Sequence, residues 1–420
     1  MEKLQPKLRF PKFRENWQTR KFNEFYSFKS TNSLSRENLN YVLGDVKNIH
    51  YGDIHTKFNS HFDISNEKVP FVNPQIDLTK VTDDNYIKEG DLVIADASED
   101  YNDIGKSIEI IKLNNEKVLA GLHTFLARKE SMDISTGFPT FLLKSRKVRM
   151  EIMKIAQGTK VLSLSSSRLG NIPLDFPTLP EQTKIASFLT TVDKKIAGLK
   201  KQLTLLERYK KGVMQKIFSQ KLRFQDENGN DFPDWEEKKL GEICNIKRGA
   251  SPRPITDKKW FDNNSKIGWV RISDISKSNK YLEKTEQYFS PSAIDKSRFV
   301  KKGNMIMSIC ATLGKPIYTN IDVCIPDSFI VFEKLSLEKE YFFYYLDFIQ
   351  LNWYKYGQPG TQVNLNSEIV SNETIPVPSN FEQQKIASFL SSIDEKIIKC
   401  QGQIKTMENW KKGLLQQMFV

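Results

Sequence analysis

One segment occurs twice in this chain, and the repeat constrains the fold more than any other feature. Residues 181–196 and 382–397 are identical at 11 of 16 positions, and the same offset of 201 residues continues without a gap as far as YKKG at Tyr209 and WKKG at Trp410. Outside this block the two halves match more faintly but in the same order. We therefore expect two copies of one unit, each a variable body followed by a closely similar tail.

The fainter matches connect the two bodies. They are WQTRKFNEF at Trp17 with WEEKKLGEI at Trp235, GDLVIA at Gly90 with GNMIMS at Gly303, Gly105-Lys106 with Gly314-Lys315, and GTKVLSL at Gly158 with GTQVNLN at Gly360. Each body also predicts a mixed α/β fold. Strands are expected at 91–95, 107–113 and 123–129 before a helix at 140–156, and at 268–275, 304–310 and 328–334 before a helix at 337–356.

Each tail predicts one long helix with a narrow apolar stripe, because apolar residues recur every seven positions. The stripe positions, called the seam below, are Ile185, Leu189, Val192, Ile196, Leu199, Leu203, Leu206 and Lys210 in the first tail, and Ile386, Leu390, Ile393, Ile397, Cys400, Ile404, Met407 and Lys411 in the second. The lysine falls at the same place in both tails, as expected if a charge selects the register. A narrow stripe favours an antiparallel coiled coil of the two tails, and the alternative is that each tail packs only on its own body.

Capping boxes mark the start of both helices. Thr178-x-x-Glu181 and Ser379-x-x-Glu382 have the spacing at which the hydroxyl accepts from a first-turn amide and the glutamate reaches back to the cap amide. We therefore expect four domains: a first body at 1–176, a first conserved helix at 177–220, a second body at 221–377 and a second conserved helix at 378–420.

The net charge of +12 is concentrated in two places. Residues 1–30 carry 8 basic and 3 acidic groups and residues 181–220 carry 9 and 3, so the bodies are nearly neutral. A body that binds nucleic acid must then use local clusters. No apolar run approaches the roughly 18 residues of a membrane span. We therefore expect a cytoplasmic protein that does not associate with a membrane. The four cysteines are scattered, which favours buried or free thiols over disulfides or zinc.

Catalytic and metal-binding motifs are weak throughout. The Gly105-Lys106-Ser107 run resembles a P-loop, but Asp100 stands where its first glycine is required. Asp234 and Glu236-x-Lys238 have the letters of a nuclease site, yet a solvated turn explains them more simply. His50, His55 and His61 lack the spacing of metal ligands. We expect no catalytic residue and no metal site.

Several loops combine basic, amide and aromatic side chains, the types that hold phosphates and read base edges. They lie at 47–58, 99–106 and 158–168 in the first body, and at 247–260, 269–274, 311–316 and 360–366 in the second. Any one of them could be an ordinary turn. Their recurrence at matching places in both bodies favours a shared role.

These residues carry a family resemblance. The order of body, GT loop, IP strand and EQxxIAxxL helix, given twice, resembles the specificity subunit of type I restriction-modification systems over essentially the whole chain. EQTKIASFL and EQQKIASFL are similar to that family's conserved regions, and RGASPRPI with WVRISDI, and NIHYGDIHTKF with ASEDYNDIGK, are similar to two types of its target recognition domain. One departure concerns the proline pair that usually precedes EQ in the family: the first copy reads TLPEQ and the second reads SNFEQ.

The resemblance implies a DNA-recognition subunit that is not an enzyme by itself. Each recognition domain would read one half of a split site in double-stranded DNA, and the coiled coil would fix the gap between the halves. Two methyltransferase subunits, and in some systems two motor-nuclease subunits as well, would supply the chemistry that uses S-adenosylmethionine, ATP and Mg, leaving no cofactor in this chain. Two alternatives remain: a self-sufficient DNA-modifying enzyme, and a coiled-coil scaffold without DNA specificity.

On this interpretation the loops supply the candidate contacts. For the second half-site we expect base readout by Arg253, Arg271, Gln362 and Asn364, with Arg248 and Lys315 on phosphate. For the first half-site we expect readout by Asn48, His50, Tyr51 and Ser165, with Lys57, Lys106 and Lys160 on phosphate.

Overall fold

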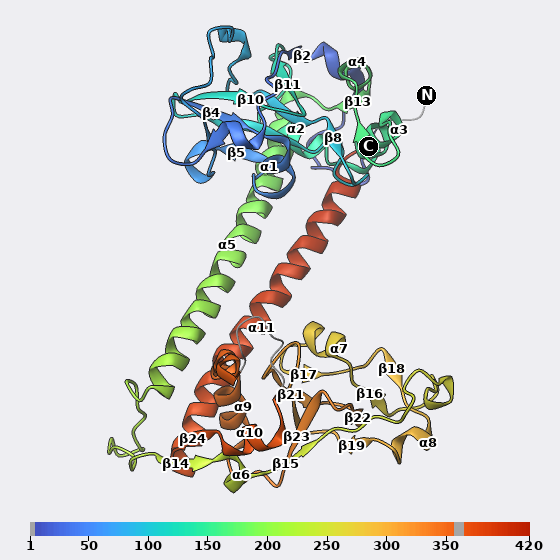
Figure 1. Ribbon diagram of the computed structural model, residues 1–420. Helices are drawn as coiled ribbons and strands as arrows, with labels where there is room; N and C mark the ends of the chain where they lie inside the picture. The colour runs from blue at the N-terminus through green and yellow to red at the C-terminus, as the bar shows by residue number, and fades with distance from the viewer. Residues whose placement is uncertain (1–4, 357–364) are drawn as a thin grey trace. The chain divides into compact units, whose positions relative to one another are not determined.

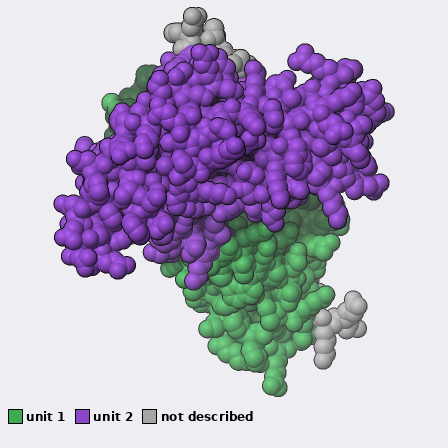
Figure 2. Space-filling view, turned by 90° about the horizontal axis from the view of Figure 1, so that it is seen from below, with its two compact units in different colours: residues 1–200, 402–420 green, residues 201–401 purple. Residues whose placement is uncertain are grey.

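The computed structural model describes residues 5–356 and 365–420, and the chain divides into two compact units (Figures 1 and 2). Unit 1 comprises residues 1–200 with 402–420, and unit 2 comprises residues 201–401. Among the described residues, no helix combines the length and the apolar character needed to cross a membrane.

Unit 1 is built around a five-stranded sheet of order β2-β11-β7-β9-β5 and a four-stranded sheet of order β10-β4-β6-β3, with the small pairs β1-β13 and β12-β8. The strands are β1 (Gln18–Lys21), β2 (Tyr26–Lys29), β3 (Leu39–Asn40), β4 (Val46–Ile49), β5 (His61–Asp63), β6 (Phe71–Val72), β7 (Leu92–Ala95), β8 (Ala97–Ser98), β9 (Ser107–Lys112), β10 (Lys117–Ala120), β11 (Thr124–Lys129), β12 (Leu162–Ser163) and β13 (Pro173–Phe176). The helices are α1 (Tyr51–Thr56), α2 (Phe138–Leu142), α3 (Arg146–Ile155) and α4 (Ser166–Gly170), with 3-10 turns at Phe22–Glu24, Arg36–Asn38, Ile64–Asn66 and Asp83–Asn85.

Unit 2 repeats this plan with a five-stranded sheet of order β15-β23-β20-β21-β17, a four-stranded sheet of order β18-β16-β22-β19 and the pair β14-β24. The strands are β14 (Glu236–Lys239), β15 (Asn245–Arg248), β16 (Gly268–Trp269), β17 (Tyr281–Leu282), β18 (Gln287–Tyr288), β19 (Arg298–Val300), β20 (Met305–Ser308), β21 (Pro316–Thr319), β22 (Val323–Ile325), β23 (Phe329–Glu333) and β24 (Thr374–Val377). The helices are α6 (Leu240–Ile243), α7 (Ile272–Lys277), α8 (Pro291–Ile294), α9 (Lys339–Phe348) and α10 (Ser367–Asn372), with 3-10 turns at Lys258–Trp260 and Gln350–Tyr356.

The strand directions in the two larger sheets are the same. Three antiparallel pairings are followed by one parallel pairing at the edge, β9 with β5 in unit 1 and β21 with β17 in unit 2. In each sheet the middle strand, β7 or β20, is buried at all four positions, as expected for a strand covered on both faces. The mixed α/β fold and the internal repeat are therefore confirmed.

Local predictions in the bodies were correct for most strands and wrong in three places. The helix expected at 140–156 is broken between α2 and α3, and the helix expected at 337–356 changes to a 3-10 turn after α9. The strand expected at 268–275 ends at Trp269, and α7 follows. There the Asp274 carboxylate accepts from the backbone amide of Arg271 at 2.8 Å, which closes a first helical turn despite the β-branched residues.

The two tails form α5 (Leu179–Phe218) and α11 (Asn380–Gln417), the long helices of Figure 1. In unit 1 the start of α5 packs in one core with the end of α11, Ile185 and Leu189 with Leu414 and Met418. In unit 2 the start of α11 shares a core with the end of α5. Each unit thus contains an antiparallel pair of helix segments, and every predicted seam position is buried or half-buried.

The seam lysines pair with aspartates at equivalent places. Lys411 Nζ lies 2.5 Å from Asp193 in unit 1, and Lys210 Nζ lies 2.8 Å from Asp394 in unit 2. Because Asp193 and Asp394 also differ by 201 residues, the two ion pairs are copies of one another. Each unit therefore fixes the register of its helix pair with the same contact.

A buried ion pair attaches each helix start to its body. Arg9 donates to both carboxylate oxygens of Glu181, at 2.8 and 2.7 Å, and Arg223 donates to both of Glu382, at 2.8 and 2.9 Å. Both glutamates have no exposed surface. The capping boxes are thus only partly correct: the helices begin at the expected residues, but the glutamates bind arginine and do not reach back to the cap amide.

The glutamine of each EQ pair holds the turn before the helix. Gln182 donates to the Pro177 carbonyl at 3.0 Å, and Gln383 donates to the Pro378 carbonyl at 2.8 Å. Each also accepts a backbone amide from its body, Ser135 or Glu338. The turn is therefore the same in both copies, although only the first has proline at the position of Phe381.

We predict that Arg9→Ala destabilises unit 1 by about 3–5 kcal/mol, because it leaves a buried carboxylate unpaired. Arg20→Ala is the matched control, since its solvent-accessible pairs with Glu24 and Asp133 should each contribute less than about 1 kcal/mol. The measurement is urea unfolding followed by tryptophan fluorescence. Equal losses in the two variants would contradict a role for the Arg9–Glu181 pair.

Candidate nucleic-acid interface

Each unit presents a short helix, α1 or α7, directly after a strand of its four-stranded sheet. His50 caps α1 by accepting from the Gly52 amide at 3.2 Å, and Arg271 occupies the same position before α7. A buried aspartate lies three residues on, Asp53 or Asp274. The two units thus use one backbone arrangement with different side chains at its surface.

The Gly-Lys pairs lie at the other end of these helices. Lys106 Nζ donates to the His55 carbonyl of α1 at 2.6 Å, and Lys315 Nζ donates to the Ile275 and Ser278 carbonyls at 2.9 and 2.7 Å. A lysine there satisfies carbonyls that have no partner within the helix. Burial lowers the pKa of Lys315. Capping of a helix end is therefore a structural role that Lys106 and Lys315 share, and their contact with phosphate stays a prediction.

Around α1, an acidic centre is surrounded by cations. Arg36 donates to both oxygens of Asp53 at 2.7 Å, and Lys57 lies 2.8 Å from the same carboxylate. Burial opposes ionisation, but these two cations hold the pKa of Asp53 below its usual range. The Arg36 and Lys57 side chains are 43% and 51% exposed, so both also face outward.

An aromatic cluster covers the start of α1. The Tyr51 ring centroid lies 4.6 Å from that of His50, 5.9 Å from that of His55 and 5.4 Å from that of His123. Burial lowers the pKa of His50, which keeps it neutral near pH 7. His123, which pairs with Asp96 at 3.3 Å, was missed because an isolated histidine carries no spacing signal.

Asn48 lies inside unit 1. It has no exposed surface, its Oδ1 accepts from Asn32 at 2.7 Å, and its side chain fills the space next to Gly121. Because a base edge cannot reach a side chain with no exposed surface, we no longer place Asn48 among the base contacts.

The remaining candidates that the structure describes lie at or near the surface. Lys160 is exposed, and Ser165 is half-buried where its carbonyl accepts the Leu169 amide of α4. Arg253 is 87% exposed, Arg271 is exposed, and Arg248 donates to the Asp327 carbonyl at 2.8 Å. Gln362 and Asn364 lie outside the described residues.

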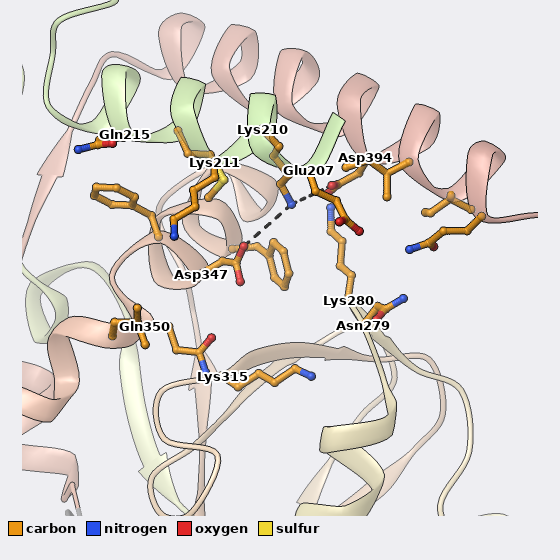
Figure 3. A pocket seen from close by; sticks show the side chains of 17 residues that line it. Glu207, Lys210, Lys211, Gln215, Asn279, Lys280, Lys315, Asp347, Gln350 and Asp394 are labelled. Atoms are coloured by element: carbon orange, nitrogen blue, oxygen red, sulfur yellow. Dashed lines mark ion pairs between the residues drawn. The ribbon is translucent and has the colours of Figure 1, made fainter. Parts of the chain in front are cut away.

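Unit 2 also contains a cavity of about 830 Å³ between its helices and its larger sheet (Figure 3). Apolar side chains from α5, α9 and α11 form much of the wall, and the Lys210–Asp394 pair lies on it, with Asp347 4.0 Å from Lys210. Burial raises the pKa of Asp347. The lining contains no Ser, Thr, Cys or His, and within 5–356 and 365–420 no three acidic, Cys or His side chains converge as metal ligands.

We predict that Lys315→Met lowers the stability of unit 2 by about 1–2 kcal/mol, because two helix-end carbonyls lose their charged donor. If helix capping is its only role, the number of phosphate contacts should not change. The measurement is DNA affinity against salt concentration, where loss of one phosphate contact would reduce the slope of log K by about 0.9. Lys160→Met, which changes an exposed lysine, serves as the comparison. A reduced salt slope for Lys315→Met would show that Lys315 contacts phosphate.

Comparison with known proteins agrees with this architecture. A family model described as the type I restriction modification DNA specificity domain matches residues 14–208 and 233–408. The putative type I restriction enzyme MjaX specificity subunit of Methanocaldococcus jannaschii is 25% identical over 372 residues, which is 82% of this chain and 83% of that protein. The MjaIX specificity subunit of the same organism is 25% identical over 296 residues, 66% of this chain and 67% of that protein.

Solved structures share the fold. The S subunit of a type I restriction-modification system from M. genitalium gives a TM-score of 0.57 at 16% identity and covers 99% of both chains. A chain from a study of complex assembly and conformational transition of the type I R-M system gives 0.61 at 15% identity, over 97% of this chain and 98% of that chain. Since the family model matches both halves, this protein belongs to the type I restriction-modification DNA specificity family.

Proposed function

We propose that this chain is the DNA-recognition subunit of a type I restriction-modification complex, in which each unit reads one half of a bipartite site. The observation that carries the proposal is the pair of equivalent frames around α1 and α7, which share a backbone plan and differ in their exposed side chains. Equivalent frames with different surfaces suit two unlike half-sites on one duplex.

The proposed contacts follow from exposure. In unit 1, Tyr51 and Lys57 are accessible beside α1, and Lys160 and Ser165 lie in a second loop. His50, which is 6% exposed, would act through its ring contact with Tyr51. In unit 2, Arg253 and Arg271 expose guanidinium groups that match guanine. Arg248, which like Arg253 contacts Asp327, is the candidate phosphate contact. Gln362 and Asn364 stay in the proposal on their sequence alone.

The partners would supply the chemistry. We propose two methyltransferase subunits, which bring S-adenosylmethionine, and in a restricting complex two motor-nuclease subunits, which use ATP and Mg. This chain would then act without a cofactor and without catalysis of its own. Its division into recognition bodies at 1–176 and 221–377 and conserved helices at 177–220 and 378–420 belongs to the same proposal.

The repeated helices present an equivalent outer surface in each unit, called the repeat patch below. It combines an aromatic ring, a glycine, a phenylalanine and two lysines, all separated by 201 residues. Its members are Lys184, Phe188, Lys195, Trp410 and Gly413 in unit 1, and Lys385, Phe389, Lys396, Tyr209 and Gly212 in unit 2. Trp410 is 47% exposed and Tyr209 is 52% exposed.

Contacts within each unit explain part of this recurrence: Phe188 packs on Phe10 and Phe389 packs on Phe224. They do not explain the glycines. A Cβ built on Gly212 or Gly413 would meet no atom within 4 Å, yet a glycine inside a helix costs about 1 kcal/mol. The four lysines form no ion pair with any described residue. Close approach of a partner with an apolar centre and an acidic rim would account for the glycines and for the lysines without ion pairs. Two copies of that partner would need two copies of the patch.

We predict that Trp410→Ser and Tyr209→Ser each reduce the number of bound methyltransferase subunits from two to one, and that the double variant binds none. Ile398→Ser is the control, because Ile398 is 61% exposed on α11 and its counterpart is Ala197. The mass of the co-expressed complex gives the stoichiometry. Two bound subunits in the double variant would rule out the repeat patch.

The DNA-recognition proposal is tested by co-expressing this chain with the methyltransferase subunit of its own system and mapping methylated positions in a mixed DNA library. We expect a bipartite motif with two unrelated halves around a fixed gap. Replacing residues 1–176 by another recognition body should change one half only. Methylation at a continuous site, or none despite a stable complex, would contradict the proposal.

A further inference from the structure

Unit 1 exposes three consecutive large apolar side chains between β3 and β4. Tyr41, Val42 and Leu43 are 43%, 84% and 58% exposed. Within 5–356 and 365–420 no other three consecutive residues of this kind are exposed. We call residues 41–43 the apolar tip. Exposed apolar side chains gathered in one place commonly mark a binding surface.

The backbone holds the apolar tip in one conformation. The Asn40 carboxamide oxygen accepts from the Val42 and Leu43 amides at 2.8 and 2.9 Å, and its nitrogen donates to Asn73 at 2.9 Å. Gly44 follows, where a Cβ would lie 2.7 Å from the Phe71 Cβ of β6. The loop is thus fixed to the four-stranded sheet at both ends, so little conformational entropy is lost when it binds.

Cations flank the tip. The Lys57 and Lys68 ammonium groups lie 5.6 and 5.0 Å from the centroid of the Tyr41 ring, and Lys57 donates to the Tyr41 hydroxyl at 3.1 Å. Lys57 also contacts Asp53, as does Arg36, and that carboxylate has no exposed surface. Exposed lysine and arginine side chains therefore supply positive charge beside the tip, and the exposed Asp45 follows it in the chain.

Among the described residues, an apolar tip of this kind occurs in unit 1 alone. The repeat patch and the GK lysines recur in both units, as expected for features that serve assembly or folding. No described segment of unit 2 exposes a comparable run. Under the proposed function, the two units differ in the half-site that each one reads. A surface feature that differs between the units is therefore a candidate for reading that half-site.

We infer that the apolar tip contacts the bases of the half-site read by unit 1, with Lys57 and Lys68 on the flanking phosphates. The inference rests on the proposed function and adds specificity-determining residues to it. Val42 and Leu43 would meet apolar base surface, such as a thymine methyl group or an opened base step, while the lysines neutralise the adjacent backbone. Tyr41, clamped between the lysines, would position them.

The test uses the complex of the full chain with its methyltransferase subunit, assayed on the mixed DNA library and on a duplex carrying the mapped site. The double variant Val42→Asn/Leu43→Asn should lose affinity for that duplex at least tenfold and relax the preference in one half-site only. Met132→Asn is the matched control, since Met132 is 85% exposed in the same unit, and it should change neither. Lys68→Gln should reduce the salt slope by about 0.9 while leaving base preference intact.

The outcomes separate the inference from the proposed function. A tip variant that retains affinity and both half-site preferences would overturn the inference alone. Loss of a bound protein subunit with unchanged preferences in the remaining complex would also overturn it, and would assign the tip to a protein partner. A wild-type complex without a bipartite motif would instead remove the proposed function on which the inference depends.

Discussion

Burial of apolar side chains from both long helices in each unit is the interaction on which the rest of the structure depends. The core of unit 1 needs the start of α5 and the end of α11, and the core of unit 2 needs the reverse combination. The hydrophobic core of each unit is therefore complete only when segments of both long helices pack into it. The two buried Arg–Glu pairs and the two seam Lys–Asp pairs then fix where each helix starts and how it is aligned.

Repetition and divergence divide the molecule by role. The order and strand directions of the five-stranded sheets, the helix anchors and the lysines that bind the ends of α1 and α7 recur in both units, so they maintain a common frame. The side chains that the frame exposes differ: an aromatic and histidine cluster with an apolar tip in unit 1, and exposed arginines in unit 2. Because a protein reads base sequence with side chains and positions itself with its frame, this division suits a family of DNA specificity subunits.

Sequence reasoning succeeded where local periodicity decides the structure. The long helices and most central strands followed from seven-residue and buried-run patterns. It failed where one distant contact decides, as for Glu181, whose partner Arg9 lies 172 residues away. It also did not find the carbonyls at the end of α7 that Lys315 binds. It also failed at residues 270–275, where one aspartate contact outweighs β propensity. The recurrence of the GK loops coincides with a shared contact, in which each lysine binds carbonyls at the end of a helix.

The sequence alone determined the two-fold repeat, the helical tails, the family resemblance and the mixed α/β bodies, because each of these is recorded in spacing along the chain. Only the tertiary structure decided which polar groups are already occupied and which face outward. Asn48 is fully buried and the ammonium groups of Lys106 and Lys315 bind helix-end carbonyls, whereas Tyr41, Val42 and Leu43 are left exposed. Exposure depends on contacts between residues far apart in sequence, and spacing along the chain does not record those contacts.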